Sequence, residues 1–328
     1  MRICRYRFEG RVQAGLYHER RIVPFEAGAL AYAHATGDQL DLHGGDNLLE
    51  YLPPSGPRLP AARKLAIWVG KVAAAPPGAR RGEAGPLDGV AIEPSAVELL
   101  VPVPRPNKLF LLAGNYAEHI EEGGGVAAER AETFPYVFMK PPSTTLTDPG
   151  KPVRIPAASP GAIDWELELA VVIGRQAKGV SESEALDAVA GYTVVNDISN
   201  RRFRPNPSRK QREKDAFFDW LHGKWHDSFC PCGPCILAAD PELDPQKLEL
   251  TLRLNGEVRQ HSSTARQIFP VAAVIEFISA IVTLEPGDII STGTPSGVGS
   301  STGTFLKPGD VLEAEIASIG SLVSPVVG

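Results

Sequence analysis

Alternating hydrophobic and polar positions predict β-strands in the middle of the chain. In the segment DWELELAVVIG, at 164–174, apolar residues recur at every second position from Leu167 to Ile173, so they would share one face of a strand. The opposite face would carry three carboxylates: Asp164, Glu166 and Glu168. The segments GYTVVNDIS and LELTLRLNGEVRQ predict further strands, and Asn255-Gly256 in the latter indicates a tight hairpin turn.

Helical signatures are fewer and shorter. AARKLAIWVGKVAAA predicts a helix near the N-terminus, and PVAAVIEFISAIVTL predicts a core helix with Pro270 at its first turn. SESEALDAVAG predicts a short helix in which Ser181 and Glu184 form a capping box. The phrases LEPGDIIST and LKPGDVLEAEI each predict a turn followed by a strand.

These patterns together predict an α+β fold that is mainly β. A small N-terminal α+β domain would span 1–75, and a larger, mostly β domain would span 103–328. The intervening residues 76–102 contain PPGARRGEAGPLDG, whose proline and glycine content is typical of a linker or exposed loop.

Composition narrows the function classes. The chain has 328 residues, of which 43% are hydrophobic and 22% charged, as in ordinary globular proteins. The net charge of −6 argues against broad affinity for nucleic acid or membranes. The opening MRICRYRFEG lacks the apolar core of a secretory leader, and Glu276 interrupts the longest apolar run. We therefore expect a cytoplasmic protein without nucleic-acid or membrane partners.

The cysteines allow two interpretations. One is Cys4, and the other three lie in CPCGPC at 230–235, which could form a metal or redox site or hold free thiols in a proline-rich turn. A zinc site would need a second ligand pair, and only His222 and His226 lie nearby in sequence. Free thiols in a reducing compartment are the favoured interpretation.

The carboxylates of the 164–174 segment could mark a metal site. Alternating charges usually form a solvated strand face, but the strand continues as LAVVIG, which is apolar on both faces and suggests burial. Adjacent buried carboxylates repel each other unless a cation compensates them. A second apolar strand ends at Asp197, so Glu166, Glu168 and Asp197 could bind Mg²⁺ or Mn²⁺. A 2-oxo acid could fill two open positions of such a metal, which would then hold an enolate.

A second candidate for chemistry is GNYAEHIEEGGG, at 114–125. His119 and Glu122 are three positions apart and would share a face of a helix, where the carboxylate could orient the imidazole as a general base. A surface pair on a loop is the alternative. Glycines at 123–125 suggest a hinge or a flexible lid.

Eight phrases occur in an order that resembles the fumarylacetoacetate hydrolase family. They are GNYAEHIEE, FMKPPST, DWELELAVVIG, GYTVVNDIS, GKWHDSF, LNGEVRQ, LEPGDIISTGTPSGVG and LKPGD. The match extends from Val103 to the C-terminus, about two-thirds of the chain. Residues 1–75 resemble the variable N-terminal domain of many bacterial members.

The resemblance implies a mixed β-sandwich roll, a homodimer and a bound Mg²⁺ or Mn²⁺. The metal ligands implied are Glu166, Glu168 and Asp197. The catalytic residues implied are His119, Glu122 and Lys224. The substrate-binding residues implied are Lys140, Arg201, Thr294 and Tyr116, with Thr294 at the substrate carboxylate.

The activity implied is hydrolysis of a C–C bond in a small 2,4-dioxo acid such as an acylpyruvate. His119, oriented by Glu122, would activate water, and Lys224, with Lys140, would stabilise the oxyanion. Two alternatives stay open at this point. Decarboxylation, isomerisation or dehydration of a 2-oxo acid or sugar acid could use the same metal, or the protein could bind a metabolite without catalysis.

The chain also departs from the family pattern. After Asp197 it reads SNRRF, in which Arg202 stands where relatives often have an acid. Seven Lys or Arg residues occupy 201–214, either as a solvated loop or as an electropositive rim that attracts anions. Asn115 stands where some members have a further aspartate ligand. We therefore expect a site of three carboxylates, with Asp164 outside it.

Overall fold

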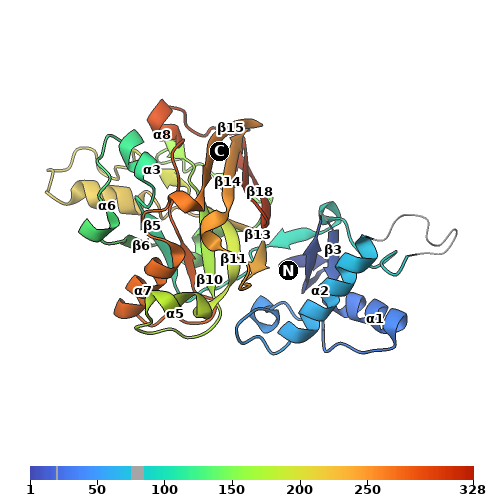
Figure 1. The fold of residues 1–328 in the computed structure, drawn as a ribbon. Helices are drawn as coiled ribbons and strands as arrows, with labels where there is room; N and C mark the ends of the chain where they lie inside the picture. Colours follow the sequence, from blue (N-terminus) through green and yellow to red (C-terminus); the bar gives the residue numbers. More distant parts are fainter. Residues whose placement is uncertain (20, 75–84) are drawn as a thin grey trace.

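The computed structural model describes residues 1–19, 21–74 and 85–328 (Figure 1). Its strands are β1 (Arg2–Phe8), β2 (Arg11–His18), β3 (Arg21–Pro24), β4 (Glu98–Leu100), β5 (Leu109–Ala113), β6 (Tyr136–Met139), β7 (Leu146–Thr147), β8 (Val153–Arg154), β9 (Ile163–Asp164), β10 (Leu167–Ile173), β11 (Val189–Asn196), β12 (Ser199–Asn200), β13 (Cys230–Ala238), β14 (Glu249–Leu254), β15 (Glu257–Ser263), β16 (Ile289–Ser291), β17 (Val311–Ile316) and β18 (Gly320–Val327). Its helices are α1 (Phe25–Thr36), α2 (Leu59–Ala73), α3 (Ala117–Glu122), α4 (Pro142–Thr145), α5 (Glu182–Ala185), α6 (Asp215–His222), α7 (Val271–Ile281) and α8 (Gly299–Thr302). The fold is mixed and mainly β, as the sequence predicted.

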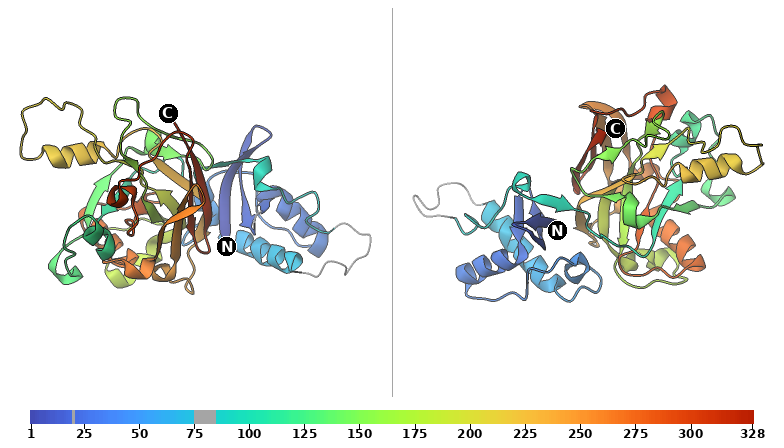
Figure 2. Two further views of the ribbon diagram at one scale, coloured as in Figure 1. Left: turned by 90° about the horizontal axis from the view of Figure 1, so that it is seen from above. Right: turned by 180° about the vertical axis from the view of Figure 1, so that it is seen from behind.

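The N-terminal strands and helices form a small unit beside the larger β-rich body (Figures 1 and 2). β1, β2 and β3 make an antiparallel meander, and α1 and α2 pack beside it. The meander continues into the larger body, because β1 also pairs with β13. The predicted linker is only partly a loop: residues 75–84 lie outside the described residues, while β4 pairs with β1.

The central sheet brings distant parts of the chain side by side. Among the described residues its main path runs β3-β2-β1-β13-β11-β10-β16-β5-β6, with β4 and β7 attached at its sides. β10 and β11 are neighbours in antiparallel register, with Leu167 opposite Asn196. The residues just before β10 and just after β11 therefore meet at one end of the sheet.

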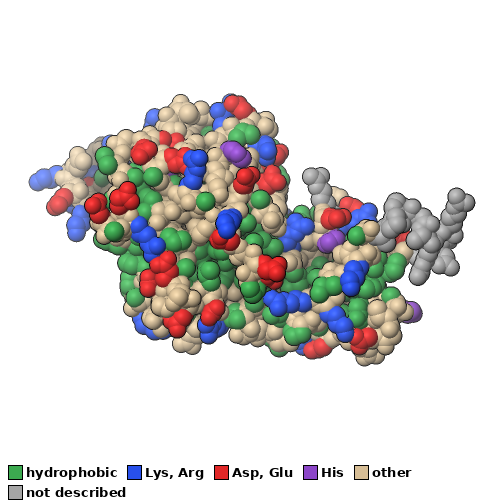
Figure 3. All heavy atoms as spheres, viewed as in Figure 1, with side chains coloured by type: hydrophobic (Ala, Val, Ile, Leu, Met, Phe, Trp, Pro, Cys, Tyr) green, Lys and Arg blue, Asp and Glu red, His purple; other side chains and the backbone are tan. Residues whose placement is uncertain are grey.

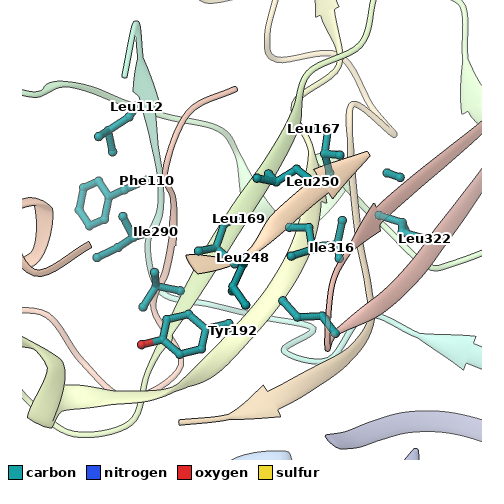
Figure 4. Packing of buried hydrophobic residues seen from close by; sticks show 14 of the residues in the cluster. Phe110, Leu112, Leu167, Leu169, Tyr192, Leu248, Leu250, Ile290, Ile316 and Leu322 are labelled. Atoms are coloured by element: carbon teal, nitrogen blue, oxygen red, sulfur yellow. The ribbon is translucent and has the colours of Figure 1, made fainter. Parts of the chain in front are cut away.

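A second sheet covers one face of the central sheet. Within the described residues it has the order β15-β14-β17-β18-β8, and the hairpin at Asn255-Gly256 joins β14 to β15 as predicted. Both turn residues have positive φ, 53° for Asn255 and 82° for Gly256, as a tight two-residue hairpin requires. Between the sheets lie Leu169, Leu250 and Ile316, which are fully buried (Figure 4). Burial of each such side chain contributes about 1.5–3 kcal/mol.

Two helical predictions are confirmed. α7 begins after Pro270 and packs its apolar face on the core, and α5 begins with the capping box of Ser181 and Glu184. Among the described residues, no helix combines the length and apolar character that crossing a membrane would require. Figure 3 shows positive and negative side chains interspersed over the visible face.

The interpretation of CPCGPC as a proline-rich turn is wrong. The segment begins β13, a fully buried strand that pairs with β1 and β11. Pro234 lies where the ladder is irregular, because the pairing of β11 with β13 shifts register between Tyr192 and Val194, whereas Pro231 lies opposite Thr147 of β7. The thiols of Cys4, Cys230, Cys232 and Cys235 are free and buried.

Candidate metal centre and active site

Three carboxylates converge where β10 begins and β11 ends. Glu166 immediately precedes β10, Glu168 lies within it, and Asp197 follows β11. The amide of Asp197 donates a hydrogen bond to the carbonyl of Glu166 at 2.8 Å, which joins the two strand ends. One oxygen from each of the three side chains lies within 4.8 Å of the others, and all three residues are buried. In the part of the chain that the structure describes, this is the one acidic, histidine or cysteine group that could hold a metal ion.

Glu168 has one satisfied oxygen and one unsatisfied oxygen. Its Oε2 accepts hydrogen bonds from Ser291 Oγ at 2.6 Å and from the amide of Gly293 at 2.9 Å. Its buried Oε1 has no hydrogen-bond partner among the described residues. Burial, together with the charges of Asp197 and Glu166, raises the pKa of Glu168 well above its usual value.

Glu166 is paired with two cations. Lys224 Nζ donates to its Oε2 at 2.8 Å, and Arg201 Nη2 lies 2.5 Å from its Oε1. Burial alone would raise the pKa of Glu166, but Lys224 and Arg201 outweigh it and hold that pKa below its usual value. Glu166 is therefore ionised, whereas Glu168, its neighbour in the trio, resists ionisation.

These carboxylates fit a divalent cation. Adjacent buried carboxylates repel each other, and the unsatisfied Glu168 Oε1 needs a partner. Four buried carboxyl groups, including Asp164, face three cationic groups from Lys140, Arg201 and Lys224. One carboxylate is thus left without a compensating charge. A hard cation with oxygen ligands, such as Mg²⁺ or Mn²⁺, would supply it.

Asp164 lies outside the trio, as the sequence suggested. It belongs to β9, which pairs with β12 rather than with the neighbours of β10. Its carboxylate accepts hydrogen bonds from the amides of Gly299 at 2.6 Å and Ser300 at 3.0 Å. It also pairs with Arg201 Nε at 2.8 Å, so it positions the arginine that contacts Glu166.

Asn115 is a structural residue. Its side-chain amide donates to the carbonyls of Phe269 and Thr292, at 3.0 and 2.8 Å, and its oxygen accepts the amide of Phe269 at 2.8 Å. These bonds fix the chain after β5 against the segment before α7 and the residue that follows β16. No oxygen of Asn115 is directed to the trio.

His119 and Glu122 form the pair that the sequence predicted. Both lie on α3, and His119 Nδ1 is 2.8 Å from Glu122 Oε1. Glu122 Oε2 accepts the amide of Gly297 at 2.9 Å. Burial would raise the pKa of Glu122, but the bonds from His119 and Gly297 lower it below the usual value. The ionised carboxylate can only accept, so Nδ1 carries the proton and Nε2 keeps the basic lone pair.

His119 of the dyad and Glu166 of the trio line one cavity of about 200 Å³. The residues lining it are Leu112, Ala113, Gly114, His119, Glu166, Arg201, Trp220, Lys224 and Thr294. Lys224 is held in this wall by its carboxylate partners and by two aromatic rings, with Nζ 5.3 Å from the centre of Phe138 and 5.7 Å from that of Trp220. A general base, a carboxylate of the trio and an ammonium group therefore face the same small space.

The structure shows where three of the predicted substrate-binding residues lie. Lys140 has no exposed side-chain surface and binds protein atoms, so it does not reach the cavity. Tyr116 is fully buried and also lies outside the cavity lining. Thr294 does line the cavity, but its hydroxyl donates to the carbonyl of Leu167 at 2.9 Å and accepts from Gln260 at 2.8 Å. That hydrogen is therefore not available to a substrate carboxylate.

Trp220 was not predicted from the sequence. It lies on α6, directly after the basic segment 201–214, and it packs edge-to-face on Phe138 with ring centres 4.9 Å apart. Its position four residues before Lys224 was the available signal, because one helical turn brings such residues together. Ser291 was also missed, although it directly precedes the TGTP phrase.

Comparison with known proteins finds relatives that cover most of the chain. The family description "Fumarylacetoacetate (FAA) hydrolase C-terminal" matches residues 108–327. The mitochondrial oxaloacetate tautomerase fahd2 of Xenopus laevis is 40% identical over 236 residues, which cover 71% of this chain and 69% of that protein.

Two solved structures match along the whole chain. One is a fumarylacetoacetate hydrolase from Exiguobacterium antarcticum, with 27% identity and a TM-score of 0.72 over 100% of this chain and 99% of that one. The other is 5-carboxymethyl-2-hydroxymuconate delta-isomerase from Mycobacterium smegmatis, with 29% identity and a TM-score of 0.67 over 100% and 98% of the two chains. The chain belongs to the fumarylacetoacetate hydrolase family.

Proposed function

We propose that the protein interconverts the keto and enol forms of a small 2-oxo acid, with oxaloacetate as the first candidate, and that it does so with a bound divalent metal. One observation carries this proposal: His119, Glu166 and Lys224 line the same cavity of about 200 Å³. Keto–enol exchange needs one base near the carbon beside the 2-oxo group, positive charge around the 2-oxo oxygen, and a cavity that fits a small acid. The cavity lining provides each of these.

Glu166, Glu168 and Asp197 are the residues that would hold Mg²⁺ or Mn²⁺. When bound, the metal would polarise the carboxylate and 2-oxo oxygens of the substrate as a Lewis acid. The site charge supports this assignment. If Glu168 ionises when a metal binds, the four carboxyl groups outnumber the three cationic side chains by one, so a dication leaves one net positive charge. That charge favours a carboxylate substrate.

His119 would move the proton. With Nδ1 engaged by Glu122, Nε2 is the nitrogen that can remove a proton from the carbon beside the 2-oxo group and return it there. The carboxylate of Glu122 stabilises the imidazolium that forms, as an oriented acid–base partner does elsewhere. Lys224 can offer a third N–H to oxyanion charge, because its other two bonds go to Glu166 and Asp197.

C–C hydrolysis of a 2,4-dioxo acid is the second candidate. The same dyad could activate a water molecule, and the relative from Exiguobacterium antarcticum is named a hydrolase. Hydrolysis requires a positioned water in addition to the groups that exchange requires. Keto–enol exchange therefore accounts for the described site with fewer assumptions, and the relative from Xenopus laevis is named an oxaloacetate tautomerase.

An absorbance assay separates the two reactions. Enol oxaloacetate absorbs in the ultraviolet, so its conversion to the keto form can be followed directly with Mg²⁺, with Mn²⁺ and after chelation. A parallel assay of acylpyruvates would report pyruvate release. Faster enol decay that depends on metal supports the proposal. Pyruvate and free acid from acylpyruvates, without any effect on oxaloacetate, would replace it by the hydrolase assignment.

A further inference from the structure

Asp197 is held at both carboxylate oxygens by lysines that come from different parts of the fold. Lys224 Nζ donates to Oδ2 at 2.6 Å from the wall of the cavity. Lys140 Nζ forms an ion pair with Oδ1 from the protein interior. Neither Asp197 nor Lys140 has any exposed side-chain surface. The two lysines therefore have unequal access to a ligand.

Lys140 is committed to the protein itself. Besides Asp197, its ammonium group donates to the carbonyl of Ile198 at 2.9 Å and to that of Phe229 at 2.5 Å. The ammonium group thus has two carbonyl acceptors and one ion-pair partner, as many oxygen partners as it has N–H donors. Lys140 follows β6, Ile198 follows β11, and Phe229 directly precedes β13, so one side chain joins three strand ends.

We propose that Lys140 is a positioning residue: it fixes Asp197 so that Oδ2 alone faces the metal position. This inference rests on the proposed metal-dependent function. It replaces the substrate-binding role that the sequence suggested for Lys140. Rotation of the carboxylate would break the ion pair at Oδ1 and leave a buried ammonium short of an acceptor, so the side chain has one favoured orientation.

The proposal also separates the roles of the two lysines. Lys224 lines the cavity and binds Glu166 Oε2 and Asp197 Oδ2, the oxygens that the proposal assigns to a cation. A cation held by those oxygens would compete with these contacts, and N–H groups of Lys224 would then be available to a substrate. Lys140 can keep all of its contacts in both states, because they lie on the other oxygen of Asp197 and on main-chain carbonyls.

A purely electrostatic role and a positioning role of Lys140 predict opposite changes in metal affinity when the lysine is removed. If the lysine acted only through its charge, its loss would make the site more negative and strengthen binding of a divalent cation. If it positions Asp197, its loss releases the ligand and weakens binding. Groups that orient metal ligands typically change metal affinity by about 10–100-fold when they are removed.

The test is Mn²⁺ binding to chelator-stripped protein, followed by calorimetry and by the electron paramagnetic resonance signal of free Mn²⁺. We expect Lys140→Met to bind Mn²⁺ about 10–100-fold more weakly than the unmodified protein. The control is Lys108→Met, since Lys108 also pairs with two carboxylates, Glu285 at 2.6 Å and Asp288 at 2.9 Å, at a place outside the site. It should leave Mn²⁺ affinity unchanged. Equal or tighter binding by Lys140→Met would overturn the inference.

Lys140→Arg covers the case in which Lys140→Met does not fold. Arginine keeps the charge, but its planar fork cannot reproduce the three contacts of the ammonium group. Positioning predicts Mn²⁺ binding weakened at least several-fold, whereas a charge effect predicts no change and would refute the proposal. Absence of Mn²⁺ binding by the unmodified protein would overturn the proposed function as well, so the two failures are distinguishable.

Discussion

His119 Nδ1 lies 2.8 Å from Glu122 Oε1, and the other oxygen of this carboxylate accepts the amide of Gly297 at 2.9 Å. Gly297 follows β16, while His119 and Glu122 lie on α3, so a single carboxylate joins the base to the β-rich body. The carboxylate trio is built on the strands of the same body. The short helix α3 is therefore held against the part of the structure that would carry the metal.

Replacement of His119 should abolish proton transfer without loss of the metal. We expect His119→Ala to lower kcat by about 10²–10⁴-fold, the range for a general base. Mn²⁺ affinity should not change, because no atom of His119 belongs to the trio. The readouts are enol oxaloacetate decay at saturating Mn²⁺ and direct Mn²⁺ titration.

Glu118→Gln is the matched control for that experiment. Glu118 lies on the same helix, but its carboxylate pairs with Arg266 at 2.8 Å rather than with the histidine. Its replacement should leave kcat within about threefold of the unmodified protein. Full activity of His119→Ala would contradict the assignment of the base.

The cysteines should be inert in the folded protein. All four are buried, and burial raises the pKa of Cys230 and of Cys235 to about 12, so thiolate is scarce at neutral pH. A thiol reagent should therefore label the native chain negligibly within an hour and label all four after denaturation in guanidinium. Rapid labelling, or zinc bound in equal amount to the chain, would restore the metal-site interpretation of CPCGPC.

Sequence patterns could predict the carboxylates and the dyad because each pattern is local. Strand alternation placed Glu166 beside Glu168, helical spacing placed His119 beside Glu122, and the end of an apolar strand marked Asp197. The role of Lys140, by contrast, could not be predicted from a local pattern. It depends on three strand ends that lie far apart in sequence, and no local periodicity records that they meet.

The errors also have physical causes. CPCGPC contains the residues most typical of turns, yet it forms a strand because β1 and β11 pair with it and the core covers it. Tertiary pairing overrides local propensity in such cases. The basic segment 201–214 is a loop, but the helix α6 that follows it was not predicted, and its Trp220 packs on Phe138 and lines the cavity.

Asp215 should make the segment before α6 sensitive to acid. It accepts hydrogen bonds from Arg209 and Arg212, which lower its pKa to about 2. A depressed carboxyl pKa contributes stability above the unfolded-state value of about 3.9, and that contribution is lost as the pH falls toward 2. We expect Asp215→Asn to remove this contribution at neutral pH.

The readout for Asp215 is trypsin cleavage within 201–214, which is rich in Lys and Arg. At neutral pH, Asp215→Asn should be cleaved there several-fold faster than the unmodified chain. Urea unfolding should show the two proteins differing by a constant amount above about pH 5 and converging between about pH 4 and 2. A difference that persists unchanged down to pH 2 would refute this role.

Glu168→Gln should abolish metal binding and make the metal-free protein more stable. The amide oxygen can take the place of Oε2 and accept from Ser291 and Gly293, while the amide nitrogen takes the place of the unsatisfied Oε1. In the metal-free protein this removes a buried group that ionises only at a cost, because its pKa lies well above the usual value. We expect the free energy of unfolding to rise by about 1–3 kcal/mol at neutral pH, because the amide lacks the raised folded-state pKa of the buried carboxyl group. Mn²⁺ binding should be lost.

The pH dependence identifies the cause of that gain. A carboxyl group with a raised folded-state pKa binds its proton more tightly in the folded state, so the unmodified protein becomes less stable as the pH rises above about 4.3. The advantage of Glu168→Gln should therefore be large at pH 7 and shrink as the pH falls toward 4, in protein kept free of metal by a chelator. Saturating Mn²⁺ should reverse the order, because only the unmodified protein gains the binding free energy. A variant less stable than the unmodified protein at pH 7 without metal would show that Glu168 is not the strained member of the trio.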